Sequence, residues 1–273
     1  MAYADELDPA GSVLWFYAED LRRRREAAGM TQRALASAAY MSPSMLNKIE
    51  AGKRLPTKDL SEVADREFGT EDHFQRLWRL VIRYAYPPWF RPFVDLEEAA
   101  SAIRSFQVQV VPGLLQTEDY ARAVLSAGRP DREALEEQVA ARLERQRILT
   151  RDTPPELWIV LDENVLRRPM GSTDTMRNQL ERLIEAAQTP SNVIQIVPYS
   201  AGGHAGVAGP FAALTLDEGP DVVYVDGFLQ GQILADPADV KAATRAYDLL
   251  TAVALSPDQS IDLIADALKD HSS

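Results

Sequence analysis

Residues 21–56 have the sequence LRRRREAAGMTQRALASAAYMSPSMLNKIEAGKRLP, and this stretch decides the fold of the first part of the chain. Its apolar residues recur at the spacing of amphipathic helices, and turn-forming residues separate the helical segments. The pattern predicts three short helices joined by tight turns. We expect them at about Trp15–Ala28, at Gln32–Ala38 and from Pro43 to the residues before Gly52.

Capping signals mark the helix boundaries in this stretch. Gly29 suits the left-handed position after a helix end, where a side chain would be strained. Thr31 and Ser42 can accept hydrogen bonds from the first free N–H groups of the second and third helices. Pro43 stands at the first position of the third helix, where its missing N–H costs nothing. The second and third helices therefore form a predicted helix-turn-helix.

The helical pattern continues beyond this stretch and then breaks. We expect a fourth helix opening at Pro56–Thr57 and a fifth at about Glu71–Tyr84. Pro87–Pro88 follows within an aromatic-rich segment, so we place a domain boundary here. Residues 1–86 are expected to form a helix-turn-helix domain and residues 87–273 a second domain. The aromatic residues fit either a plug where two domains meet or part of a dimer contact.

Composition favours an ordinary globular protein of the cell interior. Of the 273 residues, 46% are hydrophobic and 26% are charged. The chain has no cysteine, which excludes disulfides, thiolate catalysis and zinc fingers. No apolar run approaches the ~20 residues of a membrane span, and the acidic N-terminus lacks the order of a signal peptide. We therefore expect a cytoplasmic protein without membrane contact.

Charge is distributed unevenly along the chain. The net charge is −12, which by itself argues against nucleic acid. Between Leu21 and Lys58, however, nine basic residues face two acidic ones, a local charge of +7. Attraction to phosphate is local because charges beyond about 8–10 Å are screened. A basic face on an acidic body is therefore compatible with DNA binding.

The order of residues in the first domain resembles the Xre/Cro and phage-repressor class of helix-turn-helix regulators. The resemblance covers about residues 15–80 and rests on Gly29-Met30-Thr31-Gln32, Leu35-Ala36, Ser42-Pro43-Ser44 and Ile49-Glu50-Ala51-Gly52. It implies that the third helix enters the major groove of DNA, with its N-terminal side chains near base edges. Operators of this class are usually two-fold symmetric, so a homodimer on double-stranded DNA is implied as well.

The same resemblance assigns roles to single residues. Gln32 would bond a phosphate near the start of the second helix, where the helix dipole assists. Arg25 and Glu50 would form a structural ion pair between the first helix and the end of the third. The implied DNA-binding residues are Gln32, Arg33, Ser42, Pro43, Ser44, Asn47, Lys48, Lys53 and Arg54.

Two positions depart from the pattern of that class. Tyr40 stands where relatives usually have a glycine with positive φ, so this turn is either strained or differently shaped. Pro43 and Ser44 are too short for the bidentate base contacts of Arg, Asn or Gln. Lys48, Asn47 and DNA shape are then expected to carry much of the specificity.

The second region alternates short apolar runs with helical patterns. Strands are expected at residues 106–111, 157–161, 193–197, 211–216 and 222–225, and helices at 133–150, 176–187, 236–254 and 257–268, besides a short helix capped by Thr117. The whole chain is therefore predicted to be α+β. An all-α five-helix domain would precede a mixed α/β domain.

Several segments of this region resemble the C-terminal domain of WhiJ-like actinobacterial Xre regulators. They are Val111–Thr117 with Tyr120-Ala121, Arg142–Arg147, Leu166–Pro169 and the loop Gly202-Gly203-His204. Members of that family often pair with a small protein encoded nearby. The resemblance therefore implies an interaction or sensor module and no known reaction.

A ligand or partner site is one interpretation of polar residues that come from different segments of this region. Surface ion pairing is the other interpretation, and it is the one that we favour. The candidates are Arg145, Gln146, Glu163, Arg168 and His204. An enzyme would need His204 with Asp162, Glu163 or Asp226, but no catalytic or phosphate-binding motif accompanies it. We expect no enzyme, no cofactor and no metal.

Together these patterns predict a sequence-specific DNA-binding transcriptional regulator whose second domain binds a small partner protein or ligand. One alternative is an antitoxin-like component that sequesters a small neighbouring protein. Another is an enzyme domain fused to a DNA-targeting head.

Overall fold

The computed structural model describes residues 13–84, 86–227 and 229–271. These form two compact units that divide between Pro87 and Pro88, one residue beyond the boundary expected from the sequence. The acidic N-terminus discussed above lies outside the described residues. A helical unit followed by a unit built on a mixed sheet confirms the α+β prediction.

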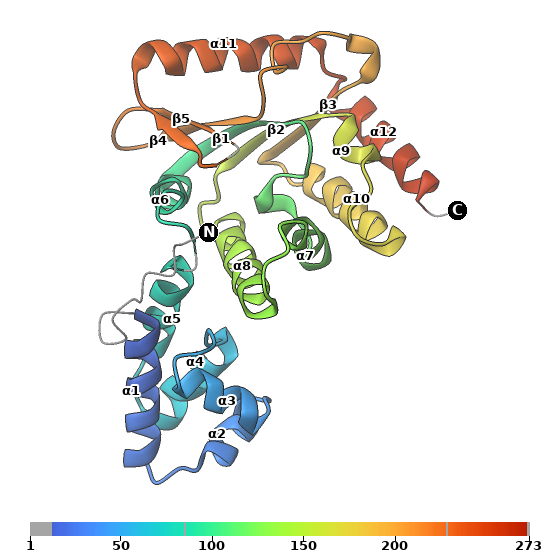
Figure 1. The fold of residues 1–273 in the computed structure, drawn as a ribbon. Coiled ribbons are helices and arrows are strands. Elements are labelled where there is room, and N and C mark those ends of the chain that lie inside the picture. Colours follow the sequence, from blue (N-terminus) through green and yellow to red (C-terminus); the bar gives the residue numbers. More distant parts are fainter. Residues whose placement is uncertain (1–12, 85, 228, 272–273) are drawn as a thin grey trace. The chain divides into compact units, whose positions relative to one another are not determined.

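The first unit contains the five predicted helices (Figure 1). They are α1 (Val13–Ala27), α2 (Gln32–Ala38), α3 (Pro43–Glu50), α4 (Lys58–Phe68) and α5 (His73–Tyr84). Thr31, Ser42 and Thr57 accept hydrogen bonds from the third residue after each of them, so three helices begin where local capping chemistry predicts.

The core of this unit lies where all five helices converge. Leu21, Leu35, Leu46, Ile49, Leu60 and Phe74 have no exposed surface. Tyr17 is equally buried, and its hydroxyl lies 2.8 Å from Ser61 Oγ. Because Leu35 of α2 and Leu46 and Ile49 of α3 are buried in this core, packing holds a helix pair that is too short to be stable alone.

Asp65 fixes the start of α5 from inside the protein. Its carboxylate accepts hydrogen bonds from the backbone N–H groups of Phe74 at 2.8 Å and Gln75 at 3.1 Å. The Thr70 hydroxyl donates a third bond of 2.7 Å. Free N–H groups and the helix dipole both favour an anion at this end. The buried charge of Asp65 is therefore stabilised by the helix it caps.

A six-stranded sheet organises the second unit, in the order β3-β2-β1-β4-β5-β6. The strands are β1 (Ala100–Gln107), β2 (Glu156–Asp162), β3 (Asn192–Val197), β4 (Phe211–Leu216), β5 (Val222–Val225) and β6 (Gln232–Leu234). The first three are parallel, and β4, β5 and β6 are added antiparallel to their neighbours. The parallel half ends its strands at one edge, beside Asp162 and Val197.

Helices cover the two faces of this sheet unequally (Figure 1). The helices of this unit are α6 (Arg91–Ala99), α7 (Glu118–Ser126), α8 (Arg132–Arg145), α9 (Asn164–Arg167), α10 (Thr173–Ala187), α11 (Pro237–Val253) and α12 (Pro257–Asp270). The long α11 lies on one face, while α7, α8 and α10 lie on the other. The smaller core under α11 contains Phe106, Val160, Val197, Tyr247 and Leu250. Among the residues that the structure describes, no helix has the length and apolar character needed to cross a membrane.

Two expected elements are wrong in their bounds. The strand expected at 106–111 is β1, and it ends at Gln107. The Tyr120 hydroxyl accepts a hydrogen bond from Val111 N, so the chain has already left the sheet there. The helix expected to continue to residue 150 ends at Arg145 and tightens into a 3₁₀ turn, Gln146–Thr150.

The aromatic segment at the boundary divides between the two cores. Trp78 is buried in the helical unit and donates to Pro56 O at 3.1 Å. Phe90 and Phe93 belong to the sheet unit, where Phe93 stacks on Tyr224 with ring centroids 4.1 Å apart. Ordinary core packing therefore accounts for these three rings.

We predict that Asp65→Ala destabilises the helical unit by about 2–4 kcal/mol, because buried N–H groups lose their acceptor. Native-state hydrogen exchange of α4 and α5 peptides in the full chain measures this loss. Asp72→Ala is the control, since Asp72 pairs with Arg76 on the exposed side of the same helix end. It should cost less than about 1 kcal/mol. Equal losses in the two variants would contradict the capping role.

Candidate nucleic-acid interface

Helix α3 has two opposite faces. Its inner face contributes Leu46, Ile49 and Glu50 to the buried interior. The residues that the sequence assigned to base contacts lie on the other face and are exposed: Ser42, Pro43, Ser44, Asn47 and Lys48. The N-terminus of this helix is therefore open to solvent, and its first turn presents small side chains.

The predicted phosphate contacts lie around this face. Arg33 at the start of α2 and Lys53 after α3 are exposed, and Gln32 and Arg54 are half-buried. Arg33, Lys53 and Arg54 form no ion pair with any described residue. These three guanidinium and ammonium groups are thus available to an anion outside the protein.

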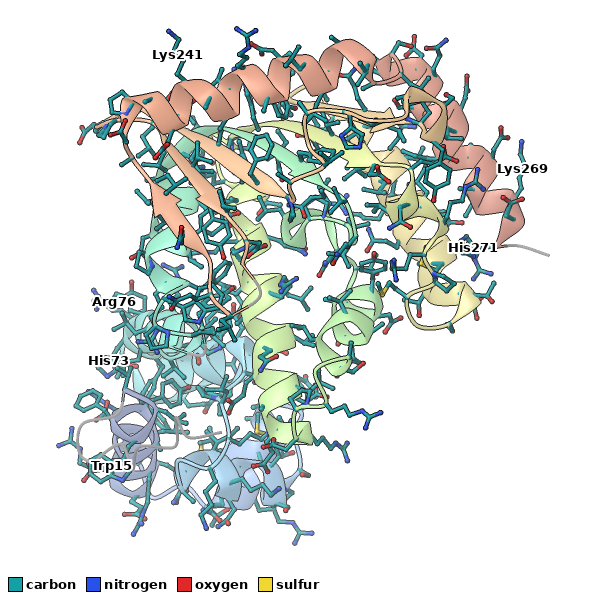
Figure 2. All side chains as sticks on the ribbon, turned by 45° about the horizontal axis from the view of Figure 1, so that its top comes forward. Trp15, His73, Arg76, Lys241, Lys269 and His271 are labelled. Carbon is teal, nitrogen blue, oxygen red and sulfur yellow. The ribbon has the colours of Figure 1, made fainter. Side chains whose placement is uncertain are left out.

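The arginines of α1 contribute less free positive charge than their number in the sequence suggests. Arg23 and Arg24 pair with Asp20 at 2.7 and 3.0 Å, and Arg22 pairs with Glu26 at 3.0 Å. The Nε2 atom of His73, labelled on α5 in Figure 2, lies 2.7 Å from the same Asp20 carboxylate. Burial raises the pKa of Asp20, but hydrogen bonds from these partners outweigh it, so the net pKa is lowered. Much of the local positive charge is neutralised inside the unit.

Arg25 and Glu50 meet as the resemblance implied, in a buried two-pronged ion pair. Arg25 Nε and Nη2 lie 2.6 and 3.0 Å from the two Glu50 oxygens. Only 9% of the Arg25 side chain and 2% of the Glu50 side chain are exposed. Hydrogen bonding to Glu50 raises the pKa of Arg25. Arg25 also donates to Met30 O, so one side chain joins α1, the α1–α2 turn and α3.

Gln32 belongs to this network, which the sequence did not indicate. Its amide Nε2 donates to Glu50 Oε2 at 2.7 Å. An amide nitrogen carries two hydrogens, so this bond uses one and orients the group. The ion pair therefore also positions the residue that was expected to contact a phosphate.

We predict that Arg25→Ala destabilises the helical unit by about 3–5 kcal/mol, because Glu50 is left as an unpaired buried charge. The double variant Arg25→Met with Glu50→Leu should lose less than Arg25→Ala, since no charge remains buried. Arg22→Ala removes only an exposed pair and should cost less than about 1 kcal/mol. Hydrogen exchange in α1 and α3 peptides distinguishes the three. A double variant as unstable as Arg25→Ala would contradict this account.

The candidate ligand residues of the second unit separate into two groups. Arg145 and Gln146 lie at the end of α8, where Gln146 Nε2 donates to Gly113 O and Gln116 O at 2.8 Å each. Arg145 Nε lies 2.8 Å from Glu97 Oε2, an ion pair without the alignment of a hydrogen bond. Burial raises the pKa of Glu97, although Arg145 and Arg142 oppose the shift.

The other group lies at the carboxyl ends of the parallel strands. Glu163 accepts a hydrogen bond from Tyr199 N at 2.9 Å and pairs with Arg167. His204 Nδ1 accepts from Gly206 N, and its Nε2 lies 3.5 Å from Asp162 Oδ2. Both ring nitrogens of His204 thus have partners within the protein, and Asp226 is bound to Tyr224 instead.

No contact among the described residues joins Arg145 or Gln146 to Glu163, Arg168 or His204. The prediction of a ligand or partner site from these five residues stays a prediction. Four of them hold loops and helix ends in place, and Arg168 is exposed. Gln146 binds the loop after β1, whereas His204 packs on Phe106 near the end of β1.

Sequence reasoning missed a network around the segment Val111–Thr117. Gln116 donates to Val111 O at 2.7 Å and accepts from Arg142 Nη1 at 2.8 Å. Gln179 accepts from Thr117 N and donates to Leu115 O. A Cβ on Gly113 would lie 2.6 Å from Arg145 Nη2 and 2.9 Å from Arg142 Cδ, so a side chain here would displace these arginines. The contacts of the segment Val111–Thr117 therefore show a structural role for its residues.

An open groove of about 550 Å³ along α11 was also missed. It is lined by Pro220, Asp221, Ala235, Pro237, Val240, Lys241, Thr244, Arg245 and Asp248. Lys241, labelled on α11 in Figure 2, and Arg245 lie one turn apart and pair with no described acidic residue. The α11 pattern alone could not reveal the groove, because residues 220–221 and 235 come from other segments.

A capped α2–α3 pair with an exposed second helix defines a helix-turn-helix protein. Comparison with protein families agrees, since residues 17–76 match a helix-turn-helix domain. Residues 90–266 match a domain of unknown function (DUF5753), which covers more than half of the chain. The chain therefore belongs to the DUF5753 family. Comparisons with curated proteins and with solved structures found no match.

Proposed function

We propose that the protein is a sequence-specific transcriptional regulator that binds double-stranded DNA through α3. The observation that carries this proposal is the exposed face of α3, set between the unpaired cations Arg33, Lys53 and Arg54. The helix-turn-helix match supports it. We further propose that the regulator is of the Xre type, related to the WhiJ-like actinobacterial group, and that it acts in the cytoplasm.

The side chains suggest that some residues contact bases and others contact phosphates. Asn47 can bond an adenine edge through two atoms, and Lys48 can donate to guanine acceptors in the major groove. Lys53 and Arg54 would lie along the phosphates, which fixes the position of the protein without selecting a sequence. Gln32 and Arg33 would contact phosphate at the N-terminus of α2, where free N–H groups favour an anion.

We also propose that a homodimer binds two half-sites. In this class the two recognition helices enter major grooves one turn of DNA apart, about 34–36 Å. A dimer doubles the number of base contacts, which offsets the short reach of Pro43 and Ser44. Footprints on the protein's own promoter region should therefore show two-fold symmetry.

We predict different losses from two lysine substitutions. Lys48→Ala should relax or abolish the choice of site, since a base contact is removed, at a cost of about 1–3 kcal/mol. Lys53→Ala should weaken all sites similarly and reduce the salt slope of binding by about 1. Fluorescence anisotropy on the footprinted site and on unrelated DNA, across several salt concentrations, measures both effects.

Lys58→Ala is the matched control, because Lys58 pairs with Glu62 at 3.4 Å on α4, outside the proposed interface. It should bind as the native protein does. Unchanged binding in both Lys48→Ala and Lys53→Ala would reject the proposed docking of α3.

For the second unit we propose binding of a small partner protein in the groove along α11. The apolar wall from Pro220, Pro237 and Val240 offers contact area, and Lys241 and Arg245 offer unpaired positive charge. A partner segment that alternates apolar and acidic side chains fits this surface. We propose no catalytic role, since His204 is engaged by Asp162 and Gly206.

We predict that the double variant Lys241→Glu with Arg245→Glu weakens binding of a small protein encoded nearby by about tenfold or more, through charge repulsion. Isothermal titration calorimetry with the purified partner measures the change. Lys269→Glu on α12 is the control, because Lys269 is exposed and pairs with Asp266 away from the groove. Equal affinities in all three proteins would rule out this groove.

The antitoxin-like alternative differs in what the partner does to DNA binding. If sequestering the partner is the main task, loss of the groove should release an activity of the partner while promoter occupancy stays the same. A regulator should instead change its promoter occupancy when the partner binds. Footprinting with and without the partner separates the two.

A further inference from the structure

Tyr40 combines two unusual properties. Its side chain is 98% exposed, and its backbone has a left-handed conformation with φ of +52°. For a residue with a Cβ this conformation costs roughly 1–2 kcal/mol. The ring and hydroxyl form no hydrogen bond or ring contact with any described residue. The side chain therefore contributes strain and no visible packing to the folded protein.

The backbone around Tyr40 closes α2 in a geometry that normally selects glycine. Tyr40 N donates to Ser37 O at 3.2 Å, and Met41 N donates to Ala36 O at 2.9 Å. This pair of bonds is the Schellman motif, whose left-handed residue is usually glycine. Tyr40 occupies that left-handed position.

The neighbouring helices end in the same motif with glycine. After α1, Gly29 N donates to Glu26 O and Met30 N to Arg25 O. After α3, Gly52 N donates to Ile49 O and Lys53 N to Lys48 O. Both glycines have positive φ, as Tyr40 does. One unit thus uses glycine at two equivalent positions and a large, strained, exposed aromatic residue at the third.

The position of Tyr40 suggests what its side chain does. It lies two residues before Ser42, the N-cap of α3, and the exposed surface continues through Ser42, Pro43 and Ser44. Those three side chains are short. A tyrosine extends roughly 6 Å beyond its Cα, by the bond lengths of an aromatic side chain. That length exceeds one turn of an α-helix, about 5.4 Å, so the ring is long enough to extend beyond the short side chains at the start of α3.

We propose that Tyr40 is a DNA-contacting residue, whose ring packs on a deoxyribose and whose hydroxyl donates to a phosphate at the edge of the major groove. Strain retained at a solvent-exposed position is common at functional sites. A phenol is a neutral donor, so the contact adds affinity without adding a counterion-releasing charge. This inference rests on the proposed function, since it requires α3 to bind duplex DNA.

The test compares stability with affinity in the full chain. Tyr40→Gly should raise the thermal unfolding midpoint of the helical unit, because glycine adopts the left-handed conformation without strain. The same variant should bind the footprinted DNA about tenfold more weakly, since a hydrogen bond to a charged group is lost. Tyr40→Phe should lose affinity while keeping the native stability. Neither variant should change the salt slope, in contrast to Lys53→Ala.

Glu71→Gly is the matched control. Glu71 is also exposed and left-handed, with φ of +55°, but it lies before α5 and outside the proposed interface. Its replacement should raise the unfolding midpoint and leave DNA binding no weaker than in the native chain. A loss of affinity in Tyr40→Gly but not in Glu71→Gly, with similar gains in stability, would support the contact of Tyr40 with DNA.

Three outcomes would overturn the inference. Native affinity in Tyr40→Gly would show that the ring and hydroxyl make no contact with DNA. A shift in the dimer dissociation constant with unchanged affinity per dimer would assign Tyr40 to self-association instead. Equal losses in Tyr40→Gly and Glu71→Gly would trace the effect to backbone flexibility. If the native chain itself prefers no site, the proposed function fails and not this inference alone.

Discussion

The buried pair of Arg25 and Glu50 is the constraint on which the helix-turn-helix depends. Helix α3 has eight residues and α2 has seven, too few for either to be stable alone. Apolar packing of Leu46 and Ile49 holds α3 against the core, but the hydrophobic effect has no preferred direction. The two-pronged bond to Arg25 adds a directional constraint, because a guanidinium fork matches a carboxylate in one plane. Gln32, bound to the same carboxylate, then orients the start of α2.

The sheet unit depends on a different constraint. Where the chain leaves β1, its backbone N–H and C=O groups need hydrogen-bond partners other than a neighbouring strand. The segment Val111–Thr117 carries a proline and a glycine and forms no strand, so its peptide groups need other partners. Glutamine side chains supply them. Gln116, Gln146 and Gln179 donate to four backbone carbonyls of this segment. What resembles a family signature is thus a set of residues that hold a loop.

Local sequence signals predicted the helices of the first unit well. Features that depend on contacts between distant segments were predicted less well. The caps Thr31, Ser42 and Thr57 act within three residues, so their effects can be deduced from sequence. Strand β1 was misplaced because it lies between β2 and β4, where both faces are covered and apolar residues do not alternate strictly. The exposed face of α3 followed from its helical period. The contacts of the five candidate ligand residues could not be deduced in this way, because contacts between side chains of distant segments depend on the tertiary fold.

Ion pairs of the α1 arginines reduce the positive charge that is available to bind DNA. The sequence shows nine basic residues between Leu21 and Lys58, but Arg22, Arg23, Arg24 and Arg25 have partners inside the unit. The cations left near the α3 face are few, and each counterion-releasing contact contributes about one to the salt slope. On the proposed docking, non-specific attraction is therefore modest. Site choice must then come from the face of α3 and from the shape of the DNA, which is where a neutral contact such as that of Tyr40 has the most effect.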